Sequence, residues 1–232
     1  MIPKMIHYCW FGGKPLPKDV LDCIKTWEKY CKRWDESNFD VNSHPFMKAA
    51  YEAKAWAFVS DYARLKVVYD NGGIYLDTDV ELLKKPDFLL ENQCYIGIQQ
   101  PESLCTTGLG FGAQKSSPVV QKMMECYDSI SFTDQKKSTF ACPWLNDKVI
   151  RSFGKVSNED ITYLKEVTVY PPRFFDPLST GNTKNLLCDE TVSIHHYAAT
   201  WAGNKQRWKR KLIRFFGEDR YFKLKKLFRR VQ

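Results

Sequence analysis

The sequence of 232 residues lacks the features of a membrane-spanning, exported or zinc-finger protein. No run approaches the roughly 20 consecutive apolar residues of a transmembrane helix, and the first residues lack the charged-then-apolar layout of a signal peptide. The eight cysteines show no Cys-x-x-Cys spacing, so we expect reduced and mostly buried thiols. No internal repeat or low-complexity segment is visible. These absences predict a cytoplasmic protein with one main domain.

Positive charge is concentrated at the carboxyl end of the chain. Residues 204–232 contain 12 lysines and arginines and two acidic residues, a net charge of +10, whereas the whole chain carries +8, which leaves about −2 for residues 1–203. We therefore predict a folded domain over 1–203 and a basic amphipathic helical tail over 204–232. Aromatic residues interleaved with cations favour binding to an anionic membrane surface, where each cation contributes about 1 kcal/mol. Alternatively, the apolar residues of the tail dock on the domain. We expect no binding to nucleic acid, because the domain is acidic and no known binding motif is visible.

Helical and strand-like patterns alternate along the domain. Apolar residues at helical spacing predict helices near 20–34, between 42 and 71, and at 118–130 and 142–153. Short apolar runs predict strands at 5–11, 39–41, 74–77, 80–83, 94–99, 109–112, 167–170 and 192–195. This alternation predicts an α/β fold with a mainly parallel central sheet flanked by helices.

Two carboxylates stand at the end of one predicted strand. An Asn-Gly-Gly run at 71–73 stops the preceding helix, and a short apolar run then leads to Asp77 and Asp79. Hard divalent cations prefer oxygen ligands, and a nucleotide diphosphate supplies further oxygens without enclosing the metal. The pair therefore predicts a Mn²⁺ or Mg²⁺ site that is open to a diphosphate. In an aspartyl-phosphate phosphohydrolase, the alternative for this motif, Thr or Val would stand where Glu81 stands.

A second charged pair lies on the helix before these carboxylates. Asp61 and Arg64 are three residues apart and therefore share one face of the helix predicted over 58–71. The helix brings them toward the strand that carries Asp77 and Asp79. The alternative is an ordinary ion pair on a solvated helix surface.

These motifs, in this order, resemble those of family 32 glycosyltransferases, the enzymes with a DxD sugar-binding region that include capsular polysaccharide synthesis types. The resemblance lies in the Ser-Asp-x-x-Arg motif at 60–64, the Gly-Gly-Ile-Tyr-Leu-Asp-x-Asp motif at 72–79, the opening segment 2–13 and the His-His-x-x-x-Thr-Trp segment at 195–201. It implies a GT-A nucleotide-sugar-binding fold, which is a Rossmann-like α/β fold. The family usually has Ser where Thr200 stands, and threonine keeps the hydroxyl.

The resemblance also implies roles for single residues. Trp10 would stack on the nucleotide base, and Asp61 and Arg64 would hold the ribose or the donor sugar. Asp79 would bind the metal directly, and Asp77 would bind it through water or hold the sugar and ribose.

Three further positions complete the expected site. Tyr75 would lie beside the donor, although it could equally pack in the core. Trp201 would cover the leaving diphosphate. Successive strand residues point in opposite directions, so only one of His195 and His196 is expected to bind the metal, and we favour His196.

Together these features predict a metal-dependent glycosyltransferase that uses a nucleotide sugar, preferably a UDP-sugar, and Mn²⁺ or Mg²⁺. The resemblance implies that the reaction retains the anomeric configuration. The expected acceptor is a polyprenyl-diphosphate-linked glycan at the inner face of a bacterial membrane, with residues 204–232 on the anionic membrane surface. The alternatives are a GDP-mannose-dependent mannosyltransferase, a toxin-like protein glucosyltransferase and an inactive membrane-binding module.

Overall fold

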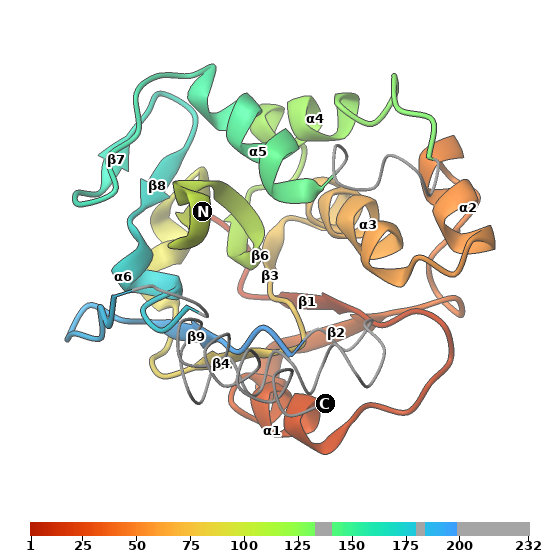
Figure 1. Cartoon of the computed structure of the whole chain (residues 1–232), viewed down its shortest axis with the longest axis horizontal. Helices are drawn as coiled ribbons and strands as arrows, with labels where there is room; N and C mark the ends of the chain where they lie inside the picture. The colour runs from red at the N-terminus through yellow and green to blue at the C-terminus, as the bar shows by residue number, and fades with distance from the viewer. Residues whose placement is uncertain (133–140, 180–183, 199–232) are drawn as a thin grey trace, which may run out of the picture.

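The computed structural model describes residues 1–132, 141–179 and 184–198. Their main element is a seven-stranded sheet, shown in Figure 1. Its order is β2 (Cys31–Trp34), β1 (Ile6–Cys9), β3 (Gly73–Tyr75), β6 (Cys105–Ala113), β5 (Cys94–Ile98), β8 (Thr168–Tyr170) and β7 (Thr162–Tyr163). In this described sheet, β6 and β7 run against the direction that the other five strands share.

Other elements cover both faces of the sheet. One face packs against α2 (Pro45–Glu52), α3 (Trp56–Asn71), α4 (Pro118–Glu125) and α5 (Cys142–Arg151). The other face packs against α1 (Lys18–Lys25), the short α6 (Pro172–Phe175) and a separate two-stranded sheet of β4 (Val80–Leu82) and β9 (Ser193–His195). Figure 1 shows the first group above the sheet, with α1 and the β4–β9 pair below it. The predicted α/β fold with a mainly parallel sheet flanked by helices is therefore confirmed.

Alternating side chains of the central strands form two separate cores. On β5, Cys94, Ile96 and Ile98 belong to the core beneath α3 and α5, whereas Tyr95 belongs to the core on the opposite face. Because successive strand residues point to opposite faces, a continuous apolar strand fills both layers. This pattern explains why β5 and β6 are buried along their whole length.

Three predicted elements differ from the structure. The helix expected over 20–34 ends at Lys25, and its last residues form β2, which pairs in parallel with β1. The strand expected at 39–41 is absent from the described fold, because β2 occupies that edge of the sheet. The strand expected at 192–195 forms β9, but it pairs with β4 outside the main sheet. The sequence analysis also missed β7, α6 and the first half of β6.

The burial of the cysteines agrees with the expectation from composition. All eight cysteines are free and five are buried, as predicted for reduced thiols. Burial raises the pKa of the Cys9 thiol to about 12, so this group stays protonated near neutral pH. Among the described residues, no helix combines the length and hydrophobicity needed to cross a bilayer.

Candidate active site

The acidic pair lies where the chain leaves β3. Gly72 and Gly73 have φ angles of 68° and 108°, a left-handed conformation that favours glycine, and they turn the chain from α3 into β3. The buried His7 of β1 secures this turn, because its Nε2 lies 2.9 Å from the Gly72 carbonyl oxygen. β3 then runs beside β1 and delivers Asp77 and Asp79 just beyond its carboxyl end.

The β4–β9 pair brings a histidine to these two carboxylates. The strands are antiparallel, and Val80 lies opposite His195 in their register. The His195 Nε2 lies 3.1 Å from the Asp79 Oδ1. One ligand atom from each of Asp77, Asp79 and His195 lies within 4.8 Å of the other two. Among the described residues, these three form a group that could hold a metal ion.

The chemistry of this group fits a divalent cation. Two carboxylates suit Mg²⁺ or Mn²⁺, and an imidazole nitrogen also binds first-row divalent metals. The His195 Nδ1 is buried and has no hydrogen-bond partner among the described residues. The His195 Nε2 therefore faces the Asp79 carboxylate, and no described carbonyl group binds the Nδ1.

The segment after β9 holds Asp79 in place. The backbone N–H of Ala198 donates to the Asp79 Oδ2 over 2.7 Å, and the backbone N–H of His196 donates to the Asp79 carbonyl over 2.9 Å. Burial alone would raise the pKa of Asp79, but His195 and the hydrogen bond from the Ala198 N–H outweigh it and lower the pKa to about 2. Asp79 is therefore ionised at neutral pH.

Arg64 joins α3 to the acidic pair. Its Nη2 lies 3.1 Å from the Asp61 Oδ1 and 3.1 Å from the Asp77 Oδ1. The Tyr75 ring lies 5.0 Å from the guanidinium carbon, and the Tyr75 hydroxyl donates to the Asp77 Oδ1 over 3.0 Å. Arg64 is only 6% exposed and Asp61 only 9%, which excludes an ordinary ion pair on a solvated helix surface.

Burial and charge act in opposite directions on this cluster. Burial raises the pKa of Asp61 to about 6, although the positive charge of Arg64 opposes the shift. Burial and the neighbouring Asp79 raise the pKa of Asp77, again against Arg64. Burial alone would lower the pKa of Arg64, but the neighbouring acidic groups, Asp77 foremost, outweigh it and raise the pKa. The guanidinium therefore stays charged and supplies the compensating cation.

The sequence analysis missed a polar cluster behind Asp61 and Arg64. The Cys142 Sγ, at the start of α5, lies 3.0 Å from the Thr107 Oγ1, 2.9 Å from the Asn146 Nδ2 and 3.8 Å from the Arg64 Nη1. Nearby Gly108 leaves room for Asp77, because an added Cβ would lie 2.6 Å from the Asp77 Oδ2. The helix over 142–153 was predicted, but its spacing alone gives no sign that its first residue contacts Arg64 of α3.

The sequence analysis also missed a contact between the rings of His195 and Tyr197. The Tyr197 ring centroid lies 4.1 Å from that of His195. The Tyr197 hydroxyl donates to the Asp176 Oδ2 over 2.8 Å, and the backbone N–H of Gln100 donates to the same oxygen over 2.8 Å. Asp176 is 1% exposed, so this chain of contacts fixes the segment after β9 against the main domain.

The preference for His196 as metal ligand needs correction. His196 lies beyond β9 with its Nε2 2.7 Å from the Glu81 Oε2, whereas His195 lies at the acidic pair. The two side chains diverge as the strand pattern requires, but the β4–β9 register decides which of them lies beside Asp79. That register depends on contacts between distant segments and cannot be derived from the sequence of β9 alone.

Replacing these two histidines separately tests the assignment. We expect His195→Ala to weaken Mn²⁺ binding at least about tenfold, because it removes a nitrogen ligand. His196→Ala, the matched control, is expected to leave Mn²⁺ affinity nearly unchanged. Calorimetric titration with Mn²⁺ measures both values, and equal effects of the two variants would contradict the assignment.

The remaining predicted site residues are the two tryptophans. Trp10 directly follows β1 and is partly exposed, with its Nε1 donating to the Lys14 carbonyl over 2.6 Å. Because β1 and β3 are parallel neighbours, Trp10 lies at the same edge of the sheet as Asp77. Trp201, Thr200 and the predicted tail over 204–232 fall outside the described residues.

Comparison with known proteins agrees with the geometry of this site. The model of a glycosyltransferase sugar-binding region containing a DXD motif matches residues 16–96, which include Asp61, Arg64, Asp77 and Asp79. The chain is also 22% identical to a curated protein, "Uncharacterized glycosyltransferase L373" of Acanthamoeba polyphaga mimivirus, over 95% of this chain and 90% of that protein.

Two solved structures are similar to this chain at lower sequence identity. The PaToxG glycosyltransferase is 17% identical with a TM-score of 0.48, over 65% of this chain and 69% of that chain. The galactosyltransferase LgtC, in complex with donor and acceptor sugar analogues, is 12% identical with a TM-score of 0.46, over 89% of this chain and 92% of that chain. The DXD-region match, the curated relative and the acidic site at the end of β3 together indicate that this protein is a glycosyltransferase with an α/β fold.

Proposed function

We propose that the protein is a family 32, metal-dependent, retaining glycosyltransferase. It moves a hexose or an N-acetylhexosamine from a UDP-sugar to a lipid-linked oligosaccharide in bacterial capsular or surface polysaccharide synthesis. The observation that carries the proposal is the convergence of Asp77, Asp79 and His195 within 4.8 Å, next to the buried ion cluster of Asp61 and Arg64.

Asp77, Asp79 and His195 would hold Mn²⁺ or Mg²⁺. When bound, the cation supplies positive charge to the diphosphate as it leaves the anomeric carbon. Asp79 is suited to this role because it is ionised and its position is fixed by Ala198. Tyr75, which we expected either beside the donor or in the core, is buried and acts on Asp77 through its hydroxyl.

Arg64 and Asp61 would orient the donor. A guanidinium has several donors in a fixed plane, so it can hold Asp77 and still donate to a hydroxyl group of the ribose or sugar. Trp10 would stack on the base, and Trp201 would cover the diphosphate. We assign no protein nucleophile: in the retaining reaction of the family, the acceptor hydroxyl attacks the face that the diphosphate leaves.

The acceptor and the location are part of the same proposal. A polyprenyl-diphosphate carrier would present the acceptor sugar at the inner face of the cell membrane. Residues 204–232, with a net charge of +10, would bind the anionic membrane surface from the cytoplasm. The alternatives are a GDP-mannose donor, a protein acceptor as in toxin-like glucosyltransferases, or an inactive membrane-binding module.

A donor panel tests the proposed function. Nucleotide release is measured with UDP-glucose, UDP-galactose, their N-acetylated analogues and GDP-mannose, each with Mn²⁺ and with a chelator. We expect slow hydrolysis of a single UDP-sugar, lost when the metal is removed. Release from GDP-mannose alone would favour the mannosyltransferase. Absence of both turnover and binding for every donor would favour the inactive module.

A further inference from the structure

A pocket lies at the opposite end of the strands from the acidic site. It opens between the starts of β1 and β3, the turn after α1 and the segment that follows β4, and it has a volume of about 370 Å³. Met5, Ile6 and Ile74 lie at the starts of the two parallel strands, whereas Asp77 follows their carboxyl ends. The pocket is therefore separate from the candidate active site. Its volume is in the range of small-molecule sites.

The walls of this pocket are mostly apolar. Ile6, Trp27 and Ile74 are buried residues of its lining, and Leu82 and Leu90 are partly buried against the same core. The polar group of Trp27 already has a partner, because its Nε1 donates to the Val80 carbonyl over 2.9 Å. Such walls offer contact to a hydrocarbon group and little to a sugar or a free ion.

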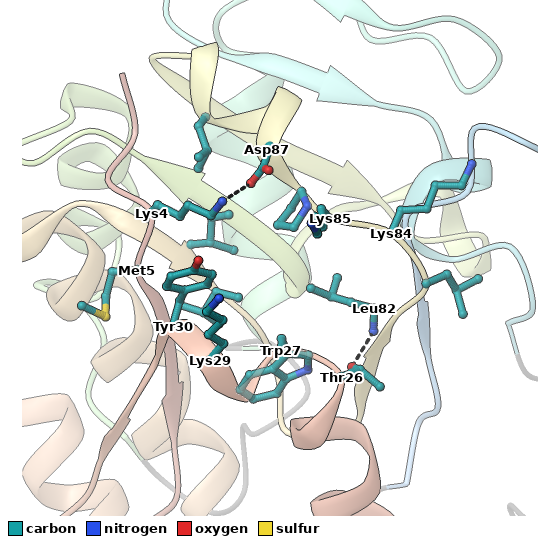
Figure 2. A pocket seen from close by; sticks show the side chains of 15 residues that line it. Lys4, Met5, Thr26, Trp27, Lys29, Tyr30, Leu82, Lys84, Lys85 and Asp87 are labelled. Carbon is teal, nitrogen blue, oxygen red and sulfur yellow. Dashed lines mark hydrogen bonds and ion pairs between the residues drawn. The ribbon is translucent and has the colours of Figure 1, made fainter.

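Lysine side chains lie around the pocket, as Figure 2 shows. Four lysines and one aspartate line the pocket, which gives a net charge of +3. Lys4 forms an ion pair with Asp87 at 2.7 Å, and Lys84 donates to the Asp189 carbonyl. Lys29 and Lys85 are exposed and form no ion pair with any described residue. Two ammonium groups are thus available to an anion at the mouth.

Aromatic and apolar side chains extend this surface outward. The ammonium groups of Lys4 and Lys29 lie 5.0 Å and 5.5 Å from the centre of the Tyr30 ring, so both cations gather around one side chain. Met5 and Leu83 are 40% and 45% exposed at the same pocket. An apolar cavity whose mouth carries exposed apolar residues and free lysines suits an amphiphile with an anionic head.

We propose that this pocket binds a hydrocarbon chain of an anionic membrane lipid, whose phosphate lies against Lys29 and Lys85. Charge complementarity argues for this occupant over the predicted tail of the same chain, since residues 204–232 carry a net charge of +10 and the rim is also positive. The assignment goes beyond glycosyl transfer and does not depend on it.

Binding of dodecyl phosphate below its micelle concentration tests the proposal by calorimetry on the full chain. We expect dodecyl phosphate to bind at one site. Dodecylphosphocholine lacks a net negative charge and inorganic phosphate lacks a hydrocarbon chain, so each should bind at least about tenfold more weakly. The double variant Lys29→Gln/Lys85→Gln should bind dodecyl phosphate roughly 10- to 30-fold more weakly. Inorganic phosphate binding as tightly as dodecyl phosphate would show an anion site only and overturn the proposal.

Lys155→Gln/Lys165→Gln is the matched control, because it removes two exposed lysines outside the pocket. It should leave affinity unchanged, and it should bind vesicles of phosphatidylcholine and phosphatidylglycerol more tightly than the pocket variant does. Equal affinities of the two variants would place the ligand on the tail or elsewhere and overturn the proposal. Hydrolysis of the UDP-sugar in the same samples should be unaffected, so failure of the lipid site is distinguishable from failure of the enzyme.

The position of the chain has its own test. A dodecyl phosphate brominated at the end of its chain should quench tryptophan fluorescence, because Trp27 lines the pocket. Trp27→Phe should lose most of this quenching while keeping its far-UV circular dichroism. Undiminished quenching in a folded Trp27→Phe variant would contradict the placement of the chain.

Discussion

Replacement of Asp79 by asparagine is expected to reduce nucleotide release from the productive donor by roughly 10²- to 10³-fold or more. The substitution keeps the size of the side chain and removes its charge. An amide has only one acceptor oxygen, but Asp79 accepts from Ala198 with one oxygen and faces His195 with the other. The variant therefore loses an anionic ligand and one of the contacts that fix the segment after β9.

Glu81→Gln is the matched control for this experiment. Glu81 lies two residues further along, on β4, and faces His196 rather than the metal-binding group. The same change of charge at this position should leave turnover near the wild-type rate. Steady-state nucleotide release with saturating Mn²⁺ measures both variants. A Glu81→Gln variant as inactive as Asp79→Asn would mean that general loss of negative charge, not the ligand at Asp79, causes the effect.

The second large effect is expected on stability. Arg64→Met leaves two buried carboxylates, Asp61 and Asp77, without the cation that both contact at 3.1 Å. Breaking a buried ion pair from one side costs about 3–5 kcal/mol, which corresponds to a fall in Tm of about 6–20 °C for a chain of this size. Donor binding should fall as well, because Arg64 orients Asp77. Thermal unfolding followed by circular dichroism measures the first effect.

Lys66→Met, on the same helix, is the control for that prediction. Lys66 pairs with Asp70 at 2.5 Å on the partly exposed face of α3, and removal of such a pair should cost less than about 1 kcal/mol. Adding Asp61→Asn to Arg64→Met should recover part of the lost stability, because it removes one of the uncompensated charges. If Arg64→Met proved as stable as Lys66→Met, the ion cluster would not be the buried, coupled unit that the distances indicate.

Local patterns were sufficient to predict the parts of the site that lie close together in the sequence. Asp61 and Arg64 share a helix face, and Asp77 and Asp79 follow the next strand, so one helix, one glycine turn and one strand determine their meeting. His195 depends on the pairing of β4 with β9, over a separation of 116 residues from Asp79. The local periodicity of a sequence does not predict the register between two such distant strands.

The misassigned helix has a similar cause. Val20 and Ile24 pack on the core as predicted, and Cys31 and Trp34 continue the same spacing by coincidence. The structure prefers to extend residues 31–34 because the edge of β1 needs a hydrogen-bonding partner. Strand pairing thus overrides the helical pattern at residues 31–34. The cluster around Cys142 likewise depends on how α5 packs in the fold and not on the sequence of α5 alone.

The separation of β9 from the main sheet sets the order in which a newly made chain can become active. All seven strands of the main sheet lie before residue 171, so the sheet and the core beneath α3 and α5 can assemble before later residues are in place. The core on the opposite face also needs Phe174, Phe175 and Val192. His195 and Ala198, which complete the acidic site, emerge only afterwards. A nascent chain can therefore form the strands of the main sheet while Asp79 still lacks its partner histidine, which delays metal capture and donor turnover until residue 198 has left the ribosome and reached Asp79.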